Sequence, residues 1–426
     1  MIKTFTPIAS LLLGLSFLLC GSGLQGTLVP LRGQAEGFSA LMLGLIGSSY
    51  YLGFVLGCLA SPRLILRAGH IRAYATLVAL ASSVTLIHPM IIDPYVWTAA
   101  RTVIGFCLAG MYIIVESWLN DRATNTTRGL IMSAYIIVNY ATQTIGQMMV
   151  TLAPVTSFNL FAASSMLLSF GIIPVALTTS AQPAPVAIVQ FRPIRLFRVA
   201  PVGLMGSFAI GVANSGLWSL GTVFATGQGL DANGAAIFMS AIVVGGALTQ
   251  WPVGKLSDRF DRRVVLAAVM TVATAVALVL AFAPLGYKAL LWVGFIYGCV
   301  GLTGYSVAAA HAYDRADKSA LVEMATGVLL ANGVGSVIGP LVASAMMDRF
   351  GPGALFLHMV IVQLLLIAFI VYRLKTRSAT LPDDKSGFDV YSTAPMGGPI
   401  TPKTSAKDDP RLRRPVAEAE SADAAE

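Results

Sequence analysis

The 426-residue chain contains few charged residues. Asp, Glu, Lys and Arg make up only 11% of it, whereas a soluble globular domain carries about 25%. Apolar residues account for 56%, and the mean hydropathy is +0.76. This scarcity of charge excludes an ordinary soluble domain and indicates a protein that crosses the lipid bilayer many times. The length is sufficient for about a dozen spans of roughly 20 residues.

The chain also lacks the patterns typical of disulfide frameworks, metal sites and catalysis. Its four cysteines all lie in apolar segments, and none forms a Cys-x-x-Cys pair. The nucleotide-phosphate motif Gly-x-x-x-x-Gly-Lys-Ser/Thr does not occur, and no cluster of His, Asp or Glu indicates a catalytic centre. We therefore expect no disulfide, no metal, no cofactor, no ATP-driven step and no enzymatic activity.

Twelve long apolar runs make up most of the chain. In lipid, a single crossing must satisfy its backbone hydrogen bonds internally, so each run predicts a transmembrane helix. The first run resembles a secretion signal, but it continues through residue 29 and is predicted to be an uncleaved span. The runs lie at residues 5–29, 39–61, 71–92, 95–119, 130–152, 156–178, 199–222, 234–256, 264–283, 287–312, 322–347 and 353–373.

The runs fall into two sets of six, which predicts two halves at residues 1–180 and 199–375. Between them, residues 181–198 are rich in proline and arginine and are predicted to form a cytoplasmic linker. Residues 376–426 contain few large apolar side chains, so they are predicted to be a disordered cytoplasmic tail.

The net charge of +8 comes from basic residues in short loops between apolar runs, a pattern that indicates membrane topology and argues against nucleic-acid binding. Loops after odd-numbered spans hold only Arg32, Lys288 and Arg349. Because positively charged loops stay in the cytoplasm, both termini are predicted to be cytoplasmic, in a cell membrane that would be the inner membrane of a bacterium. Loops after even-numbered spans hold fourteen basic residues: Arg63, Arg67, Arg72, Arg122, Arg128, Arg192, Arg195, Arg198, Lys255, Arg259, Arg262, Arg263, Arg315 and Lys318.

The two halves also repeat in sequence. A shift of 193 residues places identical residues on each other, at the same topological positions of the two halves. A parallel repeat of two six-helix halves is typical of transporters whose binding cavity lies between the halves near mid-membrane. The matched pairs are Asp121 with Asp314, Arg122 with Arg315, Asn139 with Asn332, Gly146 with Gly339, and Gly105 with Gly298.

The segment QWPVGKLSDRFDRR, residues 250–263, joins the eighth and ninth predicted helices. Gly254 permits close helix approach, and Asp258 is followed by Arg259 and Arg262, so the turn is predicted to link two helices through ion pairs. The pattern resembles the loop signature of the major facilitator superfamily, with Asp261 in place of a glycine. The equivalent turn of the first half keeps basic residues but has Ser61–Pro62 where the aspartate would stand.

Three further segments strengthen the resemblance when they are combined with QWPVGKLSDRF: LQGTLVPL, VES and TRGLIMSAYIIVNYATQTIGQMMV. Together they resemble the YcaD-like branch of this superfamily, from the first to the last predicted helix. The resemblance implies a proton- or gradient-driven secondary transporter of a small-molecule solute. We expect it to be a monomer that works by alternating access, with protons as the coupling ion. The resemblance does not imply which solute is moved or in which direction.

Polar side chains on the predicted helices are candidates for a solute cavity. Arg101 lies about two turns inside the fourth span, where it could balance an anionic solute or proton carrier, or extend to the outer interface. Each amide or phenol could equally bond another helix, and the aromatic side chains could belong to an interfacial belt. The candidates are Gln25, Arg101, Tyr112, Asn139, Gln143, Asn214, Trp218, Tyr305 and Asn332.

In the segment GMYIIVESWLNDR, residues 110–122, Glu116 follows six uncharged residues and lies about one turn from the cytoplasmic loop. Its context resembles the sugar-porter branch, in which such a glutamate pairs with loop arginines. This resemblance favours a cytoplasmic gate, while a proton site or a side chain extending to the interface stay open. The predicted partners are Arg63, Arg67 and Arg128, and further gate residues are Asp121, Asp314 and Arg315.

The sequence therefore favours a secondary transporter over two alternatives. A non-transporting sensor or assembly partner on the same fold would be expected to carry an additional folded domain. A membrane enzyme would be expected to cluster His, Asp or Glu at membrane depth, and this chain does not.

Overall fold

The computed structural model describes residues 2–122, 128–177, 183, 192–317 and 320–376, with side chains from residue 9 onward in the first helix and from residue 130 onward in α6. Almost all of these residues lie in helices, and they contain no β-strand. This confirms the predicted all-α fold class. The tail predicted at residues 376–426 lies outside the described residues beyond Thr376, as does most of the linker predicted at residues 181–198.

Helical stretches overlie all twelve predicted runs. Three of the runs are divided rather than continuous: the third between α3 and α4, the sixth between α7 and α8, and the tenth between α13 and α14. The elements are α1 (Ile2–Ala35), α2 (Ala40–Ala68), α3 (His70–Thr85), α4 (Ile87–Met90), α5 (Pro94–Arg122), α6 (Arg128–Met148), the 3-10 turn η1 (Met149–Leu152), α7 (Phe158–Phe170), α8 (Ile172–Ala176), α9 (Pro193–Val199), α10 (Pro201–Gly227), α11 (Ala232–Arg259), α12 (Arg262–Phe282), α13 (Tyr287–Gly301), α14 (Gly304–Asp314), α15 (Leu321–Phe350) and α16 (Ala354–Thr376).

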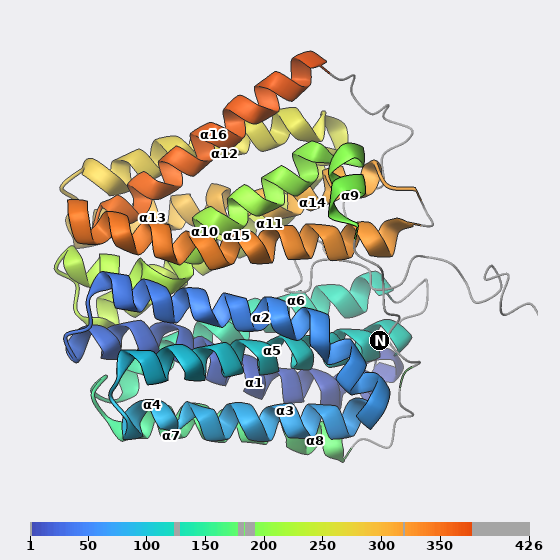
Figure 1. Cartoon of the computed structure of the whole chain (residues 1–426), viewed down its shortest axis with the longest axis vertical. Helices are drawn as coiled ribbons and strands as arrows, with labels where there is room; N and C mark the ends of the chain where they lie inside the picture. Colours follow the sequence, from blue (N-terminus) through green and yellow to red (C-terminus); the bar gives the residue numbers. More distant parts are fainter. Residues whose placement is uncertain (1, 123–127, 178–182, 184–191, 318–319, 377–426) are drawn as a thin grey trace, which may run out of the picture.

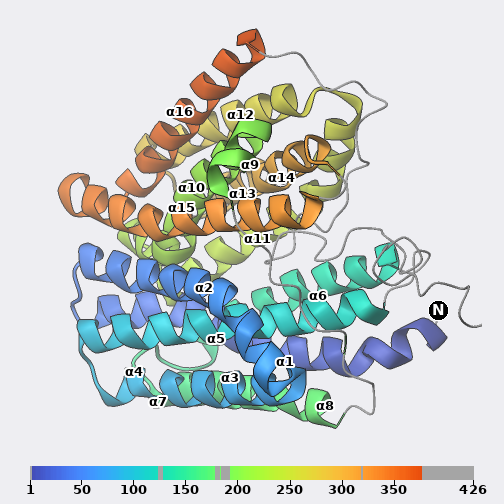
Figure 2. The same cartoon turned by 45° about the vertical axis from the view of Figure 1, so that its right-hand side comes forward.

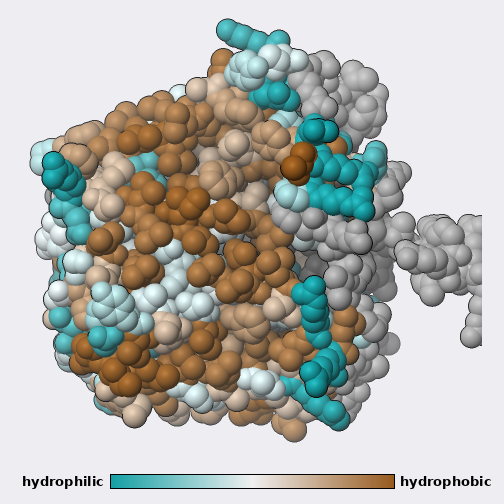
Figure 3. Space-filling model, viewed as in Figure 1, coloured by the Kyte–Doolittle hydropathy of each residue, from teal (hydrophilic) through white to brown (hydrophobic). Residues whose placement is uncertain are grey.

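Eleven of the described helical stretches are long and apolar enough to cross a membrane. The fifth predicted span, α6, is not among them because it carries many amides and hydroxyls, including Asn139, Gln143 and Gln147. Its 21 residues nevertheless cover about 31 Å at 1.5 Å per residue, which is the thickness of a hydrocarbon core. Hydrophobic side chains cover the middle of the visible surface, and hydrophilic ones gather toward its two ends (Figure 3).

The helices form two groups, α1–α8 and α9–α16, which lie side by side (Figure 1). The start of α1 and the end of α16 lie at the same end of the bundle, which we call the terminal face. The other end is the opposite face. Helices α2 and α15 meet along the boundary between the groups, and so do α6 and α11 (Figure 2).

The two halves repeat the same close helix contacts. Gly105 of α5 packs against the backbone carbonyl oxygen of Tyr50 in α2, and Gly298, 193 residues later, packs against that of Ile242 in α11. A Cβ atom at either glycine would overlap the carbonyl oxygen, so glycine is what permits the two backbones to approach this closely. Gly146 and Gly339 form a second such pair, against α1 and α10 respectively.

The apolar cores show where the halves are joined. One continuous core contains residues of both halves, and its first-half members lie near the opposite face, among them Leu28, Leu43 and Trp97. Near the terminal face, the buried side chains instead form separate clusters, one of first-half residues around Trp118 and one of second-half residues around Leu196. The described halves therefore share one core near the opposite face, whereas near the terminal face their buried clusters are separate, with Leu329 of α15 packed against the first-half cluster.

Polar contacts between the halves lie on the same side as the shared core. The Thr226 hydroxyl donates to Gln34 Oε1 at 2.7 Å, and the Leu41 backbone N–H donates to Asp348 Oδ2 at 3.2 Å. The hydroxyl of Ser48 donates to the backbone oxygen of α15 residue Val337. These hydrogen bonds connect the end of α1 and the first part of α2 to the second half.

Candidate functional site

A cavity of about 350 Å³ lies between the two halves. It is lined by α1, α2, α5 and α6 of the first half and by α10, α11, α14 and α15 of the second. Seven of the nine predicted cavity residues line it: Arg101, Tyr112, Gln143, Asn214, Trp218, Tyr305 and Asn332.

Two predicted cavity residues, Gln25 and Asn139, do not line it. Asn139 is buried, and its side chain lies with those of Tyr112 and Tyr135. The prediction that Asn139 shares the cavity with Gln143 is therefore wrong in this structure. The helical spacing placed both amides on one face, but only Gln143, one turn nearer the opposite face, reaches the space between the halves.

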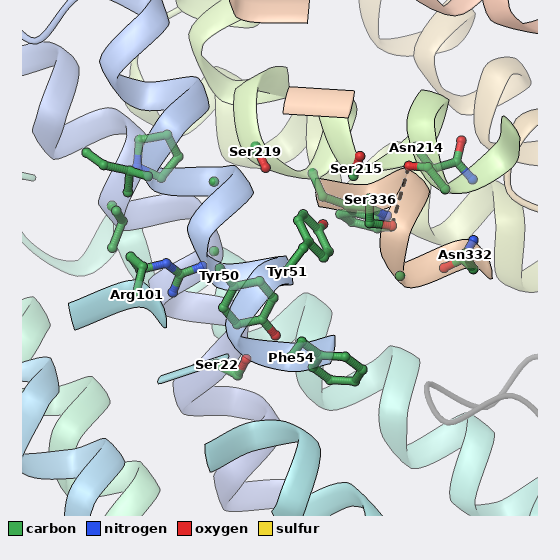
Figure 4. A pocket seen from close by; sticks show the side chains of 18 of the residues that line it. Ser22, Tyr50, Tyr51, Phe54, Arg101, Asn214, Ser215, Ser219, Asn332 and Ser336 are labelled. Atoms are coloured by element: carbon green, nitrogen blue, oxygen red, sulfur yellow. Dashed lines mark hydrogen bonds between the residues drawn. The ribbon is translucent and has the colours of Figure 1, made fainter. Parts of the chain in front are cut away.

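Helix α2 also lines the cavity, which was not predicted from the sequence. Tyr50, Tyr51 and Phe54 line it from this helix, and Tyr51 lies toward the hydroxyl groups on α10 and α15 (Figure 4). None of the nine predicted cavity residues belongs to this helix. The available signal was three aromatic residues within five positions of α2, flanked by small residues such as Ser48, Ser49 and Gly53. Small residues such as Gly47 and Gly53 let α2 lie close to its neighbours.

Among the described residues, Arg101 is the only charged one that lines the cavity. Its guanidinium carbon lies 4.4 Å from the centroid of the Tyr50 ring, and its Nη1 donates to Gln25 Oε1 at 3.3 Å. Within the described part of the chain it forms no ion pair, and its Nε is buried without a hydrogen-bond acceptor. The guanidinium therefore lies in the cavity, not at the lipid interface, with its positive charge uncompensated by these residues.

Gln25 orients Arg101 from behind the cavity wall. Its side chain is buried, and its Nε2 donates to the hydroxyls of Thr85 at 2.7 Å and Ser164 at 3.1 Å. With both donor contacts occupied by α3 and α7, its oxygen is fixed toward Arg101 on α5. Gln25 is thus a positioning residue, because it holds the cation without facing the cavity.

The other side of the cavity presents neutral polar groups. Asn214 donates to the backbone oxygen of Gly301 at 3.4 Å, where α13 ends, and Asn332 donates to that of Ser207 at 3.0 Å. These residues lie across the cavity from Arg101, with aromatic rings between (Figure 4). Each amide has further hydrogen-bonding capacity beyond these bonds. The cavity therefore has a cationic side on the first half and an amide side on the second.

Glu116 lies near the end of α5, on the terminal-face side of the cavity, and does not line the cavity. Its side chain is buried, and the Tyr135 hydroxyl donates to Glu116 Oε1 at 2.6 Å. Two of its predicted partners, Arg63 and Arg67, are exposed and make no ion pair with it, so those pairings are wrong in this structure. The third, Arg128, begins α6, but its side chain lies outside the described residues. Burial also shows that Glu116 does not extend to the interface.

The predicted link at the second half's turn involves three helices. Arg262 is fully buried; its Nε lies 2.6 Å from Asp314 Oδ2, and its Nη1 lies 3.2 Å from Asp258 Oδ1. Asp258 ends α11, Arg262 begins α12 and Asp314 ends α14, so one guanidinium joins all three. Gly254 is buried one helical turn before Asp258. Arg259 is exposed and makes no ion pair with this cluster.

Asp261, which stands where the family signature has a glycine, also forms an ion pair. Asp261 Oδ2 lies 2.7 Å from Arg263 Nη2, and Asp261 accepts from the Arg263 backbone N–H at 2.9 Å, which caps α12. Burial alone would raise the pKa of the Asp261 carboxyl, but these hydrogen bonds from Arg263 outweigh it and hold the pKa below its usual value. In the first half, Asp121 is exposed at the end of α5.

Comparison with known proteins identifies the family. The sequence profile of the Major Facilitator Superfamily matches residues 11–331 and 204–416. The chain is 30% identical over 355 residues to an uncharacterized MFS-type transporter of Enterobacter sp. (strain 638), covering 82% of this chain and 91% of that protein. It has the same identity and coverage with the uncharacterized MFS-type transporter YcaD of Escherichia fergusonii.

Solved structures show the same fold. The nucleoside transporter NupG superimposes with a TM-score of 0.70 at 14% identity, covering 86% of this chain and 99% of that one. A bacterial homolog of the human lysosomal transporter Spinster gives a TM-score of 0.71 at 14% identity, covering 89% and 97%. With a helical membrane fold, a cavity between two repeated halves and these matches, the chain belongs to the Major Facilitator Superfamily and resembles its YcaD-like members.

Proposed function

We propose that this protein is a secondary transporter that moves a small solute bearing an anionic group through the central cavity by alternating access. The observation that carries the proposal is Arg101, the only charged group lining the cavity, with no ion-pair partner among the described residues. An uncompensated cation in a partly desolvated cavity favours an anion strongly. The protein is proposed to act as a monomer in the cell membrane.

The remaining lining restricts the solute further. A volume of about 350 Å³ lies at the lower end of the range for small-molecule sites, roughly 300–1,000 Å³. Tyr50, Phe54 and Trp218 can cover an apolar or aromatic body, and the amides of Asn214 and Asn332 can bond a neutral polar group. The preferred solute is therefore a monoanion with an apolar middle, since a second anionic group would find no cation on the amide side.

Alternating access is supported by the way the halves pack. Their shared core near the opposite face and their separate clusters near the terminal face are what a transporter closed on one side would have. The basic loops predict that the terminal face is cytoplasmic, so the described state is proposed to face inward. In the other state, the halves would part near Gln34 and Thr226 and meet near the terminal face.

The experiment that tests the proposed function uses the purified protein with matched pairs of small carboxylates and their amides, benzoate with benzamide as the first pair. A carboxylate that binds the folded state should raise the unfolding temperature, because binding stabilises by mass action, while its amide should not. Uptake of that carboxylate is then measured in proteoliposomes. Stabilisation by amides alone would contradict the anionic group, and uptake that never responds to an imposed pH gradient would contradict proton coupling.

A Glu116→Gln variant is expected to slow transport while changing solute affinity by less than about twofold, because Glu116 lies outside the cavity lining. The reason is that its buried carboxylate is proposed to act as a gate near the terminal face, where the halves must approach and part. Transport rate is measured in proteoliposomes, and affinity by thermal shift.

The matched variant is Tyr135→Phe, which removes the hydroxyl that donates to Glu116 but keeps the ring. It should slow transport less than Glu116→Gln does. A large loss of affinity in Glu116→Gln would instead assign the carboxylate to solute binding.

A further inference from the structure

A second cationic feature lies at the terminal face of the second half. A small hollow there is lined by Arg263, His311, Arg315 and Arg373, together with Val199, Pro201 and Val202; we call it the basic hollow. Its side chains come from the ends of α9, α14 and α16 and from the starts of α10 and α12. The hollow therefore collects four basic groups where five helices end, outside the central cavity.

None of the described residues that line the basic hollow carries a carboxylate. Asp261 pairs with the lining residue Arg263 at 2.7 Å, and Asp314 pairs with Arg262, outside the lining, at 2.6 Å. Arg373 forms no ion pair with any described residue, and its Nε is buried without a hydrogen-bond acceptor. A buried donor on a permanent cation is costly to leave without an acceptor, so an anion bound in the hollow would satisfy it.

The short helix α9 extends the basic surface beyond the hollow. Its last residue, Val199, lines the hollow, and Leu196 is buried under the helix beside Gly327 of α15. Three exposed arginines follow one another at every third position: Arg192 just before α9, and Arg195 and Arg198 within it. Exposed Ile194 and Phe197 lie between them, with 72% and 41% of their surfaces accessible. Arginines beside exposed apolar side chains are typical of helices at a membrane interface.

Exposed apolar side chains lie next to the arginines of the basic hollow. Val264 and Tyr372, the chain neighbours of Arg263 and Arg373, are both exposed, with 50% and 60% of their surfaces accessible. Aliphatic and aromatic side chains exposed at the end of a transmembrane helix are suited to the region where acyl chains meet headgroups. An anion reaching the hollow from the side would therefore carry an apolar tail.

We propose that the basic hollow binds the phosphate of an anionic phospholipid headgroup. Arg373 and Arg315 hold the phosphate, the arginines of α9 attract the headgroup, and Ile194 and Phe197 lie among the acyl chains. Basic pockets between transmembrane helices on the cytoplasmic side are suited to such lipids, and each arginine near a charged surface adds about 1 kcal/mol. The site is independent of the solute proposed for the central cavity.

The test compares lipid binding by the full chain and two variants. Purified protein is mixed with micelles containing phosphatidylglycerol or phosphatidylcholine, the lipids retained are counted by native mass spectrometry, and the unfolding temperature is recorded. The unaltered protein should retain phosphatidylglycerol in preference and unfold at a higher temperature with it. Arg373→Gln should weaken retention roughly fivefold, which corresponds to the loss of one arginine near the surface.

Arg195→Gln is the second variant, because its exposed side chain contributes no packing and the protein will fold without it. It should weaken retention in the same direction. Arg67→Gln, which removes an exposed arginine from the terminal end of α2, is the control and should retain phosphatidylglycerol as the unaltered protein does. Equal retention by all four proteins would overturn the proposal. Equal stabilisation by inorganic phosphate at the same concentration would also overturn it, in favour of a free-anion site.

Discussion

Replacing Arg101 by Gln is expected to weaken binding of an anionic solute roughly 10- to 100-fold. Hydrogen bonds to charged groups contribute about 1.5–3 kcal/mol, and each 1.4 kcal/mol corresponds to a factor of ten. No other charged residue lines the cavity in the part of the chain that the structure describes, so no neighbouring cation there can replace the guanidinium. Affinity is measured from the concentration dependence of the thermal shift, with a carboxylate found to stabilise the unaltered protein.

Two further variants show whether the loss is specific. Gln25→Leu removes the amide that orients Arg101 but keeps the cation, so it should weaken carboxylate binding less than Arg101→Gln does. Arg63→Gln removes an exposed arginine outside the cavity and should leave binding unchanged. If Arg101→Gln binds the carboxylate as tightly as the unaltered protein, Arg101 is not the group that binds the anion, and the proposal that rests on it fails.

The second large effect concerns stability. Arg262→Gln is expected to lower the free energy of unfolding by about 3–5 kcal/mol, because it leaves the buried Asp314 carboxylate without the guanidinium at 2.6 Å. The side chain of Asp314 is only 1% exposed, so water cannot compensate for the lost cation. Unfolding is followed by circular dichroism in detergent, with heat or denaturant.

The double variant Arg262→Met with Asp314→Leu should recover much of this stability, because an apolar pair of similar volume avoids burying charge. Arg259→Gln, in the same turn but exposed, is the control and should change stability by less than about 0.5 kcal/mol. An Arg262→Gln protein as stable as the unaltered one would show that Asp314 does not depend on this ion pair. Because Arg101 and Arg262 lie in different parts of the fold, the two sets of variants report separately on binding and on stability.

The sequence by itself determined the fold class and most of the positions at which helices form. These properties are local: an apolar run of about 20 residues must form a helix in lipid, whatever surrounds it. The repeat was equally visible, because Gly105 and Gly298 each have to let two backbones approach at the same place in their half. Candidate cavity residues could also be found, since a polar group in a span needs a partner and therefore stands out.

Only the tertiary structure decided which polar groups meet. Gln25, Thr85, Ser164 and Arg101 belong to four different helices, so nothing in their spacing predicts that the amide lies behind the wall and the guanidinium inside it. The same holds for Arg262, whose partner Asp314 is 52 residues away. Helical periodicity gives the face on which a side chain lies, but the rotation of each helix against its neighbours is set by close packing among all of them. That rotation brought α2 into the cavity and kept Asn139 out of it.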